Sequence, residues 1–131
     1  MPGMRWNRRE EDRLLRSQRG PVGEDLRVRA ARVEAEQKRL AAVSPDGSHG
    51  RAAGYMRDSV TTQPGRDEIG LYADIGPTAT TPQGHPYPLD VEFGTRPHTI
   101  PNAFGRGEPV QHPGTTAQPF MRPSIEAARD T

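Results

Sequence analysis

Cysteine is absent from this 131-residue chain. Without a thiol the chain can form no disulfide framework and no thiolate zinc site. Long apolar runs are missing as well, so the sequence offers no membrane-spanning segment, and its charged N-terminus is unlike a secretory leader. We therefore expect a protein that does not interact with a membrane.

Apolar residues are also scarce. They make up 31% of the chain, aromatic residues 5%, and glycine and proline contribute 14 positions each. A typical globular domain is nearer half apolar. One domain of this length would therefore have a thin core. Either part of the chain is disordered, or neighbouring subunits supply the missing cover.

Lysine is almost absent, because 17 of the 18 basic residues are arginine. Arginine suits interfaces with carboxylates and phosphates, although codon usage in a GC-rich genome explains the same bias. The charge is also divided unevenly. Residues 1–43 carry 11 basic and 7 acidic residues, net +4, and residues 44–131 carry 7 and 10, net −3. This mild bipolarity favours head-to-tail or ring contacts.

Two helices are predicted in the N-terminal third. Residues 7–19 form a short, highly charged helix that Asn7 caps and Gly20-Pro21 ends. Residues 22–43 form the longer one, and Ser44-Pro45-Asp46-Gly47 stops it. Its apolar face follows the helical spacing, interrupted by one glutamine: Val22, Leu26, Ala30, Val33, Gln37 and Leu40.

Three strands are predicted from alternating apolar residues, over residues 55–62, 68–75 and 87–93. Pro64-Gly65 makes the first turn, and Pro77 to Pro86 forms the second connection. A period of two indicates an antiparallel sheet covered on one face, here by the long helix. Residues 95–118 lack periodicity and are predicted as a long extended loop, followed by a short closing helix within 119–130.

The predicted fold class is thus α+β, with N-terminal helices packed on a small antiparallel sheet, a long ordered loop and a short C-terminal helix. We divide the chain into a charged helical arm, residues 1–20, and a single domain, residues 21–131.

Reactive constellations are hard to find. His49, His85, His98 and His112 are predicted to lie in Gly/Pro-rich loops, without metal-ligand spacing. Ser59 lacks the glycines of a nucleophile elbow. Asp90 and Glu92 share one face of the predicted third strand, which favours an exposed face or salt bridges to a neighbour's arginines over a catalytic pair. Gly105-Arg106-Gly107 is not a phosphate-binding loop. We expect no enzyme, cofactor or metal.

The N-terminal arginines could contact DNA phosphates. The candidate DNA-facing residues are Arg5, Arg8, Arg9 and Arg13, although Glu10, Glu11 and Asp12 are interleaved with them. An exposed helix surface with salt bridges between neighbouring charges, or a subunit interface, explains the same pattern. Trp6, the sole tryptophan, is either an interface anchor or a residue packed on its own domain.

Three segments, taken in order, resemble a known family. The first is the helix end Leu40-Ala41-Ala42-Val43-Ser44-Pro45-Asp46-Gly47, followed by Gly54-Tyr55-Met56-Arg57-Asp58-Ser59-Val60. The second is Tyr87 with Leu89-Asp90-Val91-Glu92-Phe93-Gly94-Thr95, and the third is Gln118-Pro119-Phe120-Met121-Arg122-Pro123-Ser124. Together they are similar to the head–tail joining, or tail-completion, proteins of long-tailed bacteriophages, also described as neck or minor tail proteins. The match spans roughly residues 22–128. It departs from the family at Asp46-Gly47, at Pro88, and in the length of the 95–117 segment.

This resemblance implies a structural, non-catalytic virion subunit of the phage neck or upper tail, assembled in the host cytoplasm. Its partners would be copies of itself in a homo-oligomeric ring, and the connector, stopper, tail-terminator or tail-tube proteins of the virion. Genomic DNA in the lumen is a further candidate contact. We expect Phe120 to pin the C-terminus, and the arm and the 95–118 loop to reach neighbours. The candidate subunit-interface residues are Trp6, Tyr87, Glu92, Phe93, Arg96, Phe120 and Arg122. The alternative function is a small nucleic-acid-binding module that uses the basic N-terminal helix.

Overall fold

A computed structural model describes the chain except for residues 1–2, 4, 48, 101–106 and 130–131. The elements, in chain order, are the helices and strands α1 (Arg8–Leu15), α2 (Pro21–Leu40), α3 (Tyr55–Asp58), β1 (Val60–Arg66), β2 (Leu71–Pro77), α4 (Pro88–Phe93), β3 (His98–Ile100), β4 (Val110–His112) and α5 (Met121–Arg129). The predicted α+β class and the short C-terminal helix are confirmed. The predicted three-stranded sheet is wrong, because the described strands form two separate two-stranded antiparallel sheets.

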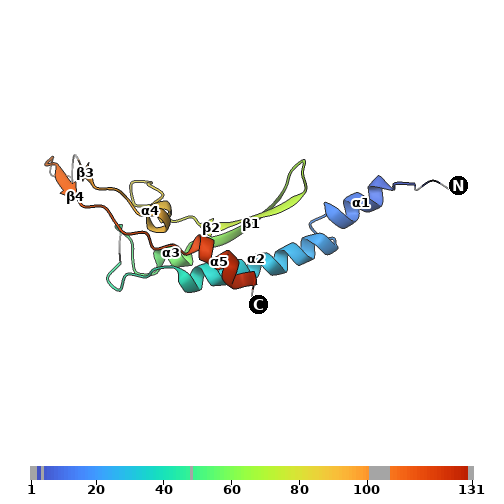
Figure 1. Cartoon of the computed structure of the whole chain (residues 1–131), viewed down its shortest axis with the longest axis horizontal. Helices are drawn as coiled ribbons and strands as arrows, with labels where there is room; N and C mark the ends of the chain where they lie inside the picture. Colours follow the sequence, from blue (N-terminus) through green and yellow to red (C-terminus); the bar gives the residue numbers. More distant parts are fainter. Residues whose placement is uncertain (1–2, 4, 48, 101–106, 130–131) are drawn as a thin grey trace.

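Helix α2 is the spine of the molecule, with the β1–β2 hairpin along one side of it and α5 along another (Figure 1). Most of the predicted stripe faces these neighbours: Ala30 and Gln37 are buried, and Leu26, Val33 and Leu40 are half-buried. Val22 is exposed, so the stripe begins one turn later than predicted.

Gln37, which interrupts the apolar stripe, binds the helix to the sheet. Its Nε2 donates to the backbone oxygen of Ile75 on β2 over 3.2 Å. Its Oε1 is buried and has no hydrogen-bond partner among the described residues. The bond to Ile75 explains a polar residue in an apolar stripe, although the acceptor side of the amide is unused.

The β1–β2 hairpin is longer than predicted on its turn side. Pro64 pairs with Ala73 and Gly65 with Tyr72 inside the ladder, so the predicted Pro64-Gly65 turn is wrong. The turn lies at residues 67–70 instead, where Asp67 Oδ1 accepts the amides of Ile69 and Gly70 over 2.9 and 3.0 Å. Proline is tolerated in β1 because a two-stranded sheet leaves each strand with a free edge.

Residues 55–58 and 88–93 are helical, where strands had been predicted. Pro88 occupies the first position of α4, where a missing amide proton costs nothing. In the helix Pro88 and Glu92 face inward and Leu89 and Phe93 face outward. Residues four positions apart thus share a face, as in a helix. Over only seven residues the apolar pattern fits the period of a strand and the period of a helix equally well, so the sequence could not distinguish them.

The segment 95–118 holds a small hairpin, which was not predicted. Strands β3 and β4 pair His98 with His112, whose ring centroids are 4.9 Å apart, so the prediction that all four histidines lie in loops is wrong for these two. A further bridge joins Thr95 to Thr115. Two glycines in the left-handed region flank it, Gly94 (φ +73°) and Gly114 (φ +83°); a Cβ there would lie 2.7 Å from the Thr115 oxygen and 2.4 Å from the Thr95 oxygen.

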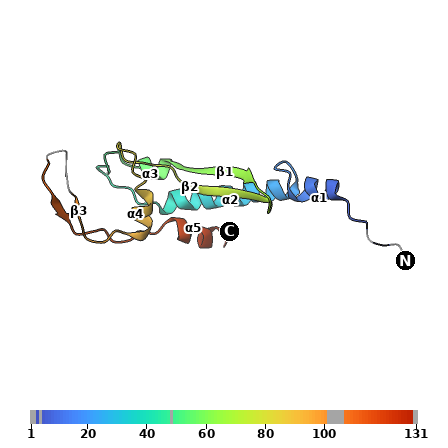
Figure 2. The ribbon, with the colours of Figure 1, turned by 90° about the horizontal axis from the view of Figure 1, so that it is seen from above.

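The hydrophobic core is small and lies at the C-terminal end of α2. Its buried members are Ala41, Met56, Ala79, Tyr87 and Phe120. From this centre the molecule extends in two directions. Helix α1 continues roughly in line with α2, and the β3–β4 hairpin projects from the opposite end (Figures 1 and 2). The described part of α1 has no buried residue, which gives residues 5–19 the character of an arm.

The solvent-accessible surface area is large, as expected for an extended shape. The chain exposes 9980 Å², whereas a compact monomer of 14.4 kDa is expected to expose about 6,800 Å². The surplus is about 3,000 Å², and a standard interface buries about 800 Å² per partner.

Candidate functional site at the α4–α5 junction

Five of the seven candidate interface residues meet where α4 abuts the start of α5. We call this contact, formed by Tyr87, Glu92, Phe93, Phe120 and Arg122, the α4–α5 junction. These residues come from two sequence motifs that lie about 30 positions apart. Their mutual contact was not predicted, because the strand assigned to 87–93 placed them on a sheet face.

The carboxylate of Glu92 holds the junction together. Its Oε2 accepts the backbone amides of Phe120 and Met121 over 2.7 and 2.9 Å. Its Oε1 accepts the backbone amide and the Nε of Arg122 over 3.1 and 3.0 Å. The first amides of a helix have no partner within the helix, and a negative charge is favourable at this end. Glu92 therefore caps α5 from a position 28 residues upstream.

Electrostatics follow from this geometry. Only 1% of Glu92 is exposed, and such burial by itself raises the pKa of a carboxyl group. The backbone amides of Phe120, Met121 and Arg122 and the guanidinium of Arg122 outweigh that effect, so the pKa of Glu92 lies below its ordinary value. The side chain is thus a buried, ionised and fully hydrogen-bonded carboxylate.

Glu92, Tyr87 and Phe120 are therefore sites of internal packing. Phe120 is 0% exposed and Tyr87 is 2% exposed, and both belong to the core cluster. Burial raises the pKa of the Tyr87 hydroxyl. The expectation that Glu92 lies on an exposed strand face and bridges to a neighbour's arginines is corrected, because its carboxylate binds residues of its own chain. Residues buried to this degree offer a neighbour almost no surface.

The exposed side of the junction has a different character. Leu89 and Phe93 lie one turn apart on α4 and are 55% and 60% exposed. The guanidinium of Arg122 lies over the Phe93 ring, 4.9 Å from its centroid. We call these three residues the α4 patch. Aromatic and arginine side chains on a rigid support are the composition of interface hot spots.

The remaining candidates lie away from the junction. Trp6 is 67% exposed on the arm, where its Nε1 donates to Glu11 Oε2 over 2.5 Å. Arg96 is exposed, and its backbone oxygen contacts His98 Nδ1 at 2.7 Å. The four candidate DNA-facing arginines are all exposed on the arm. Of these, Arg13 is paired with Glu10 at 3.2 Å.

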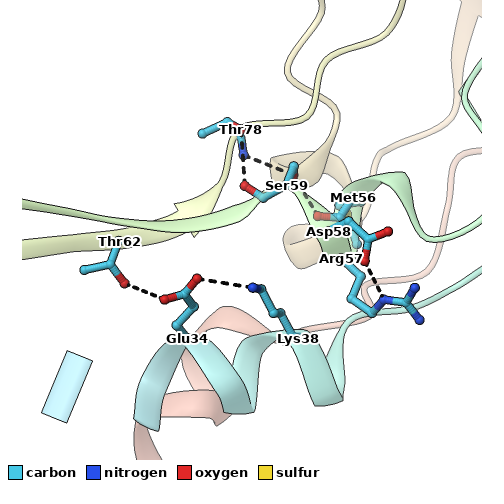
Figure 3. A network of polar contacts seen from close by, with 8 residues as sticks. All are labelled: Glu34, Lys38, Met56, Arg57, Asp58, Ser59, Thr62 and Thr78. Atoms are coloured by element: carbon cyan, nitrogen blue, oxygen red, sulfur yellow. Dashed lines mark hydrogen bonds and ion pairs between the residues drawn. The ribbon is translucent and has the colours of Figure 1, made fainter. Parts of the chain in front are cut away.

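Ser59 also proves to be structural. Its Oγ donates to the Met56 oxygen over 2.7 Å and accepts the amide of Thr78 over 3.2 Å. It thereby joins the end of α3 to the segment after β2 (Figure 3). Glu34 lies between Thr62 and Lys38 in the same view and fixes α2 to β1. The motif Arg57-Asp58-Ser59 thus has a role in turn geometry, which the sequence alone did not indicate.

A cavity of about 330 Å³ lies beside the junction, and His49, Tyr87 and Asp90 are among its lining residues. The His49 ring stacks on Tyr87 with centroids 4.2 Å apart, and burial lowers the pKa of His49. Asp90 is bonded to His85 Nε2 at 2.7 Å. Ser44, Thr115 and Thr116 also line the cavity, and no hydrogen bond between one of these hydroxyls and His49 or Asp90 is seen in the described structure. Nor do three or more His, Asp or Glu side chains gather there, or elsewhere in the described residues, as a metal site.

Comparison with known proteins adds no relative. No protein-family model matches the chain, and neither a curated protein nor a solved structure does so. In the part of the chain that the structure describes, no helix is both long and apolar enough to span a membrane. Functional inference therefore depends on the motifs quoted above and on the geometry of the junction.

Proposed function

We propose that this chain is a structural subunit of the phage head–tail interface, a neck or tail-completion protein that forms a ring and joins the DNA-filled head to the tail. The ordered motifs that resemble this family supply the class. The geometry supplies a physical reason for two of them: the motif around Glu92 and the motif around Phe120 bind each other and leave an apolar patch exposed.

The observation that carries the proposal is the α4 patch. Leu89 and Phe93 are exposed apolar side chains, and yet they sit on a helix whose inward face is locked by Glu92. Exposed apolar side chains on a rigid element are typical of a surface that a partner covers. The surplus surface of about 3,000 Å² supports the same conclusion, because it is room for more than one interface of standard size.

The proposed role is mechanical. The junction fixes the angle between α4 and α5, and α2 with its hairpin makes a stiff rod. In a ring, one copy would present its α4 patch to the next. The arm and the β3–β4 hairpin, at opposite ends of the rod, would reach adjacent subunits or rings.

The test is imaging of virions from the phage that encodes the chain, with the subunit labelled by a gold-tagged antibody. Label at the junction of head and tail is the expected result. A genome copy with Phe93→Ala should give unjoined heads and tails, and one with Ile69→Ala, an exposed apolar change on the β1–β2 turn outside the patch and the arm, is the matched control. Label along the tail tip, on the capsid face, or on no particle at all contradicts the proposal.

A nucleic-acid-binding module remains the second candidate. It is favoured by one observation: Arg5, Arg8 and Arg9 are exposed on the arm, and the described structure shows no ion pair for them. A mobility-shift assay on duplex DNA tests it, since phosphate contacts weaken steeply with salt. Absence of binding at low salt removes this candidate and leaves the ring proposal intact.

A further inference from the structure

The N-terminal half of α2 and the β1–β2 hairpin enclose an open cavity of about 320 Å³. We call it the apolar groove. Seven of its eleven lining residues are apolar or glycine: Gly23, Leu26, Ala30, Pro64, Gly65, Leu71 and Ala73, while Gln18, Arg27, Thr62 and Tyr72 complete the lining. Tyr72 lies across Gly65, where a Cβ would meet its ring at 2.3 Å. The groove lies at the end of the molecule nearest α1, outside the α4–α5 junction.

We propose that the apolar groove receives the N-terminal arm of a second copy of this chain, with Trp6 as the inserted side chain. This goes beyond the proposed function, because the ring proposal leaves the groove unassigned. The occupant is inferred from three properties of the arm: its lack of burial, its charge and its reach.

Burial is the first property. The described part of α1 has no buried residue, and Trp6 is 67% exposed. The arm contacts its own hairpin at its C-terminal end, where Arg16 Nη2 donates to the Glu68 oxygen over 3.3 Å. The part before that contact is open to a partner surface. Both views show α1 continuing beyond the end of α2 rather than folding back over it (Figures 1 and 2). Trp6 is not among the residues that line the groove of its own chain.

Charge is the second property. Residues 5–19 carry six arginines and three acidic residues, net +3. The hairpin that forms one wall of the groove, residues 60–77, carries one arginine and three acidic residues, net −2. A basic arm and an acidic wall attract each other and fix the orientation of the contact.

Reach is the third property. Trp6 lies 11 residues before Ser17, and Leu26 and Ala30 lie 9 and 13 residues after it. Most of these residues lie in α1 and α2, where each adds about 1.5 Å, and the non-helical ones between add somewhat more, so both intervals are on the order of 15–20 Å. Two copies that lie antiparallel and overlap around Ser17 would thus bring each Trp6 to the groove of the other, without bending either arm.

The experiment uses the full chain and its own fluorescence. Trp6 is the only tryptophan among the 131 residues, so the emission reports on this one ring. We expect the emission to shift to shorter wavelength as protein concentration rises, in step with the mass measured by light scattering. Pro64→Glu, at an exposed position on the groove wall, should abolish the shift. Ile69→Glu, 94% exposed on the hairpin turn and outside the groove, is the matched control and should preserve it.

A mixing test shows which copy supplies the tryptophan and which supplies the groove. Trp6→Ala has an intact groove and no anchor, and Pro64→Glu has an intact anchor and a blocked groove. Alone, each should associate through this contact at least about 30-fold more weakly than the wild type, the effect of losing a hot-spot side chain. Mixed, they should recover the shift, because the Trp6 of one enters the groove of the other. Circular dichroism of each variant verifies the fold.

Three results would overturn the inference. One is emission that is independent of concentration while the mass rises. Another is association of Trp6→Ala at wild-type strength, which leaves the ring proposal untouched because the α4 patch is a separate surface. The third is a shift that appears only on addition of duplex DNA, which assigns the arm to nucleic acid instead.

Discussion

Glu92 does the work of a helix cap from outside the helix. A capping residue normally lies next to the helix it caps and satisfies one of the free amides. Here one carboxylate satisfies the amides of Phe120, Met121 and Arg122, and it also holds the Arg122 guanidinium. Because the two partners are 28 residues apart, the bond also closes the segment between them. Removal of one side chain should thus loosen both ends of that segment.

The first prediction concerns this carboxylate. Glu92→Gln keeps the shape of the side chain but loses its charge. The amide nitrogen of glutamine would also face N–H groups, from which it cannot accept a hydrogen bond. Breaking a buried charged network in this way typically costs about 3–5 kcal/mol. We expect a loss of about 3 kcal/mol in the free energy of unfolding, measured by urea titration. Glu126→Gln, at an exposed position of α5, is the control and should change it by less than about 0.5 kcal/mol.

The pH dependence follows from the lowered pKa of Glu92. A carboxyl group whose pKa is lower in the folded state stabilises the fold above its unfolded pKa, near 4.3. That contribution is lost as the pH falls through the folded pKa. The difference in unfolding free energy between the wild type and Glu92→Gln should therefore be constant from pH 7 to about 5.5 and should shrink below about 4.5. A difference that is the same at pH 7 and pH 3 would contradict the assignment.

Two phenylalanines provide a matched pair. Phe120 is 0% exposed and Phe93 is 60% exposed. Phe120→Ala leaves a cavity in the core and should cost about 3–5 kcal/mol of folding stability. Phe93→Ala removes little buried area within the monomer and should cost less than about 1 kcal/mol, while it weakens assembly. Thermal unfolding of both variants at low concentration, together with light scattering, separates the two effects. Equal losses of monomer stability would mean that Phe93 is a core residue.

At the scale of elements, α2 is attached to β1 through Glu34 and Thr62, whereas its contact with β2 through Gln37 is an imperfect polar one. Gln37 donates to the Ile75 oxygen, but its own Oε1 is buried without a partner. A buried, unpaired oxygen costs about 1–3 kcal/mol, which offsets most of the stability that the hydrogen bond from Nε2 to the Ile75 oxygen contributes. The attachment of α2 to β2 therefore owes more to the shape of the side chain than to its polarity.

Substitution of Gln37 tests this balance. Gln37→Met keeps the volume, removes the unpaired oxygen and loses one hydrogen bond, so the unfolding free energy should change by less than about 1 kcal/mol. Gln37→Ala loses the same bond and also leaves a cavity, and should cost about 2 kcal/mol or more. Urea unfolding of the two variants gives the comparison. If Met and Ala cost the same, the hydrogen bond, and not the packing, carries the contact.

Local signals predicted the elements that are long or capped. The α2 stripe, the Asn7 cap, whose Oδ1 accepts the Glu10 amide over 3.2 Å, and the closing helix α5 were all found from spacing or turn residues. The turn at Asp67–Gly70 was missed because Pro64-Gly65 is the stronger local signal. Helix α4 was missed because the alternation of Tyr87, Leu89, Val91 and Phe93 fits a strand equally well over so few residues.

Nonlocal contacts explain the rest of what the sequence did not predict. The residues of the α4–α5 junction were selected correctly as a group, because two motifs drew attention to them. Which of them are buried depends on the bond between Glu92 and residues 120–122, which no pattern within either motif encodes. Glu92, Phe93, Phe120 and Arg122 were therefore grouped together as interface candidates. In the structure Glu92 and Phe120 are buried, and Phe93 belongs with Arg122 to the exposed α4 patch.

The whole molecule is a rod with a small core near its centre. Both ends, the arm and the β3–β4 hairpin, lie away from the core cluster (Figure 2). The fully buried large side chains are only Phe120, Glu92 and Val60, with Ser124, among the described residues. A monomer with this distribution has little to hold its ends in place. Contacts with further copies would stabilise the folded state, because they bind it and not the unfolded chain.

Thermal stability should consequently depend on protein concentration. For an assembly that unfolds to monomers, each tenfold increase in concentration adds up to about 1.4 kcal/mol, which corresponds to a rise in Tm of about 3–6 °C for a chain of this size. We expect this rise for the wild type in scans from low to high micromolar concentration. The double variant Trp6→Ala/Phe93→Ala lacks both proposed anchors and should melt at one temperature throughout. A wild-type Tm that is independent of concentration would mean that the thin core suffices to hold the rod, and that its surplus surface is not an interface between copies.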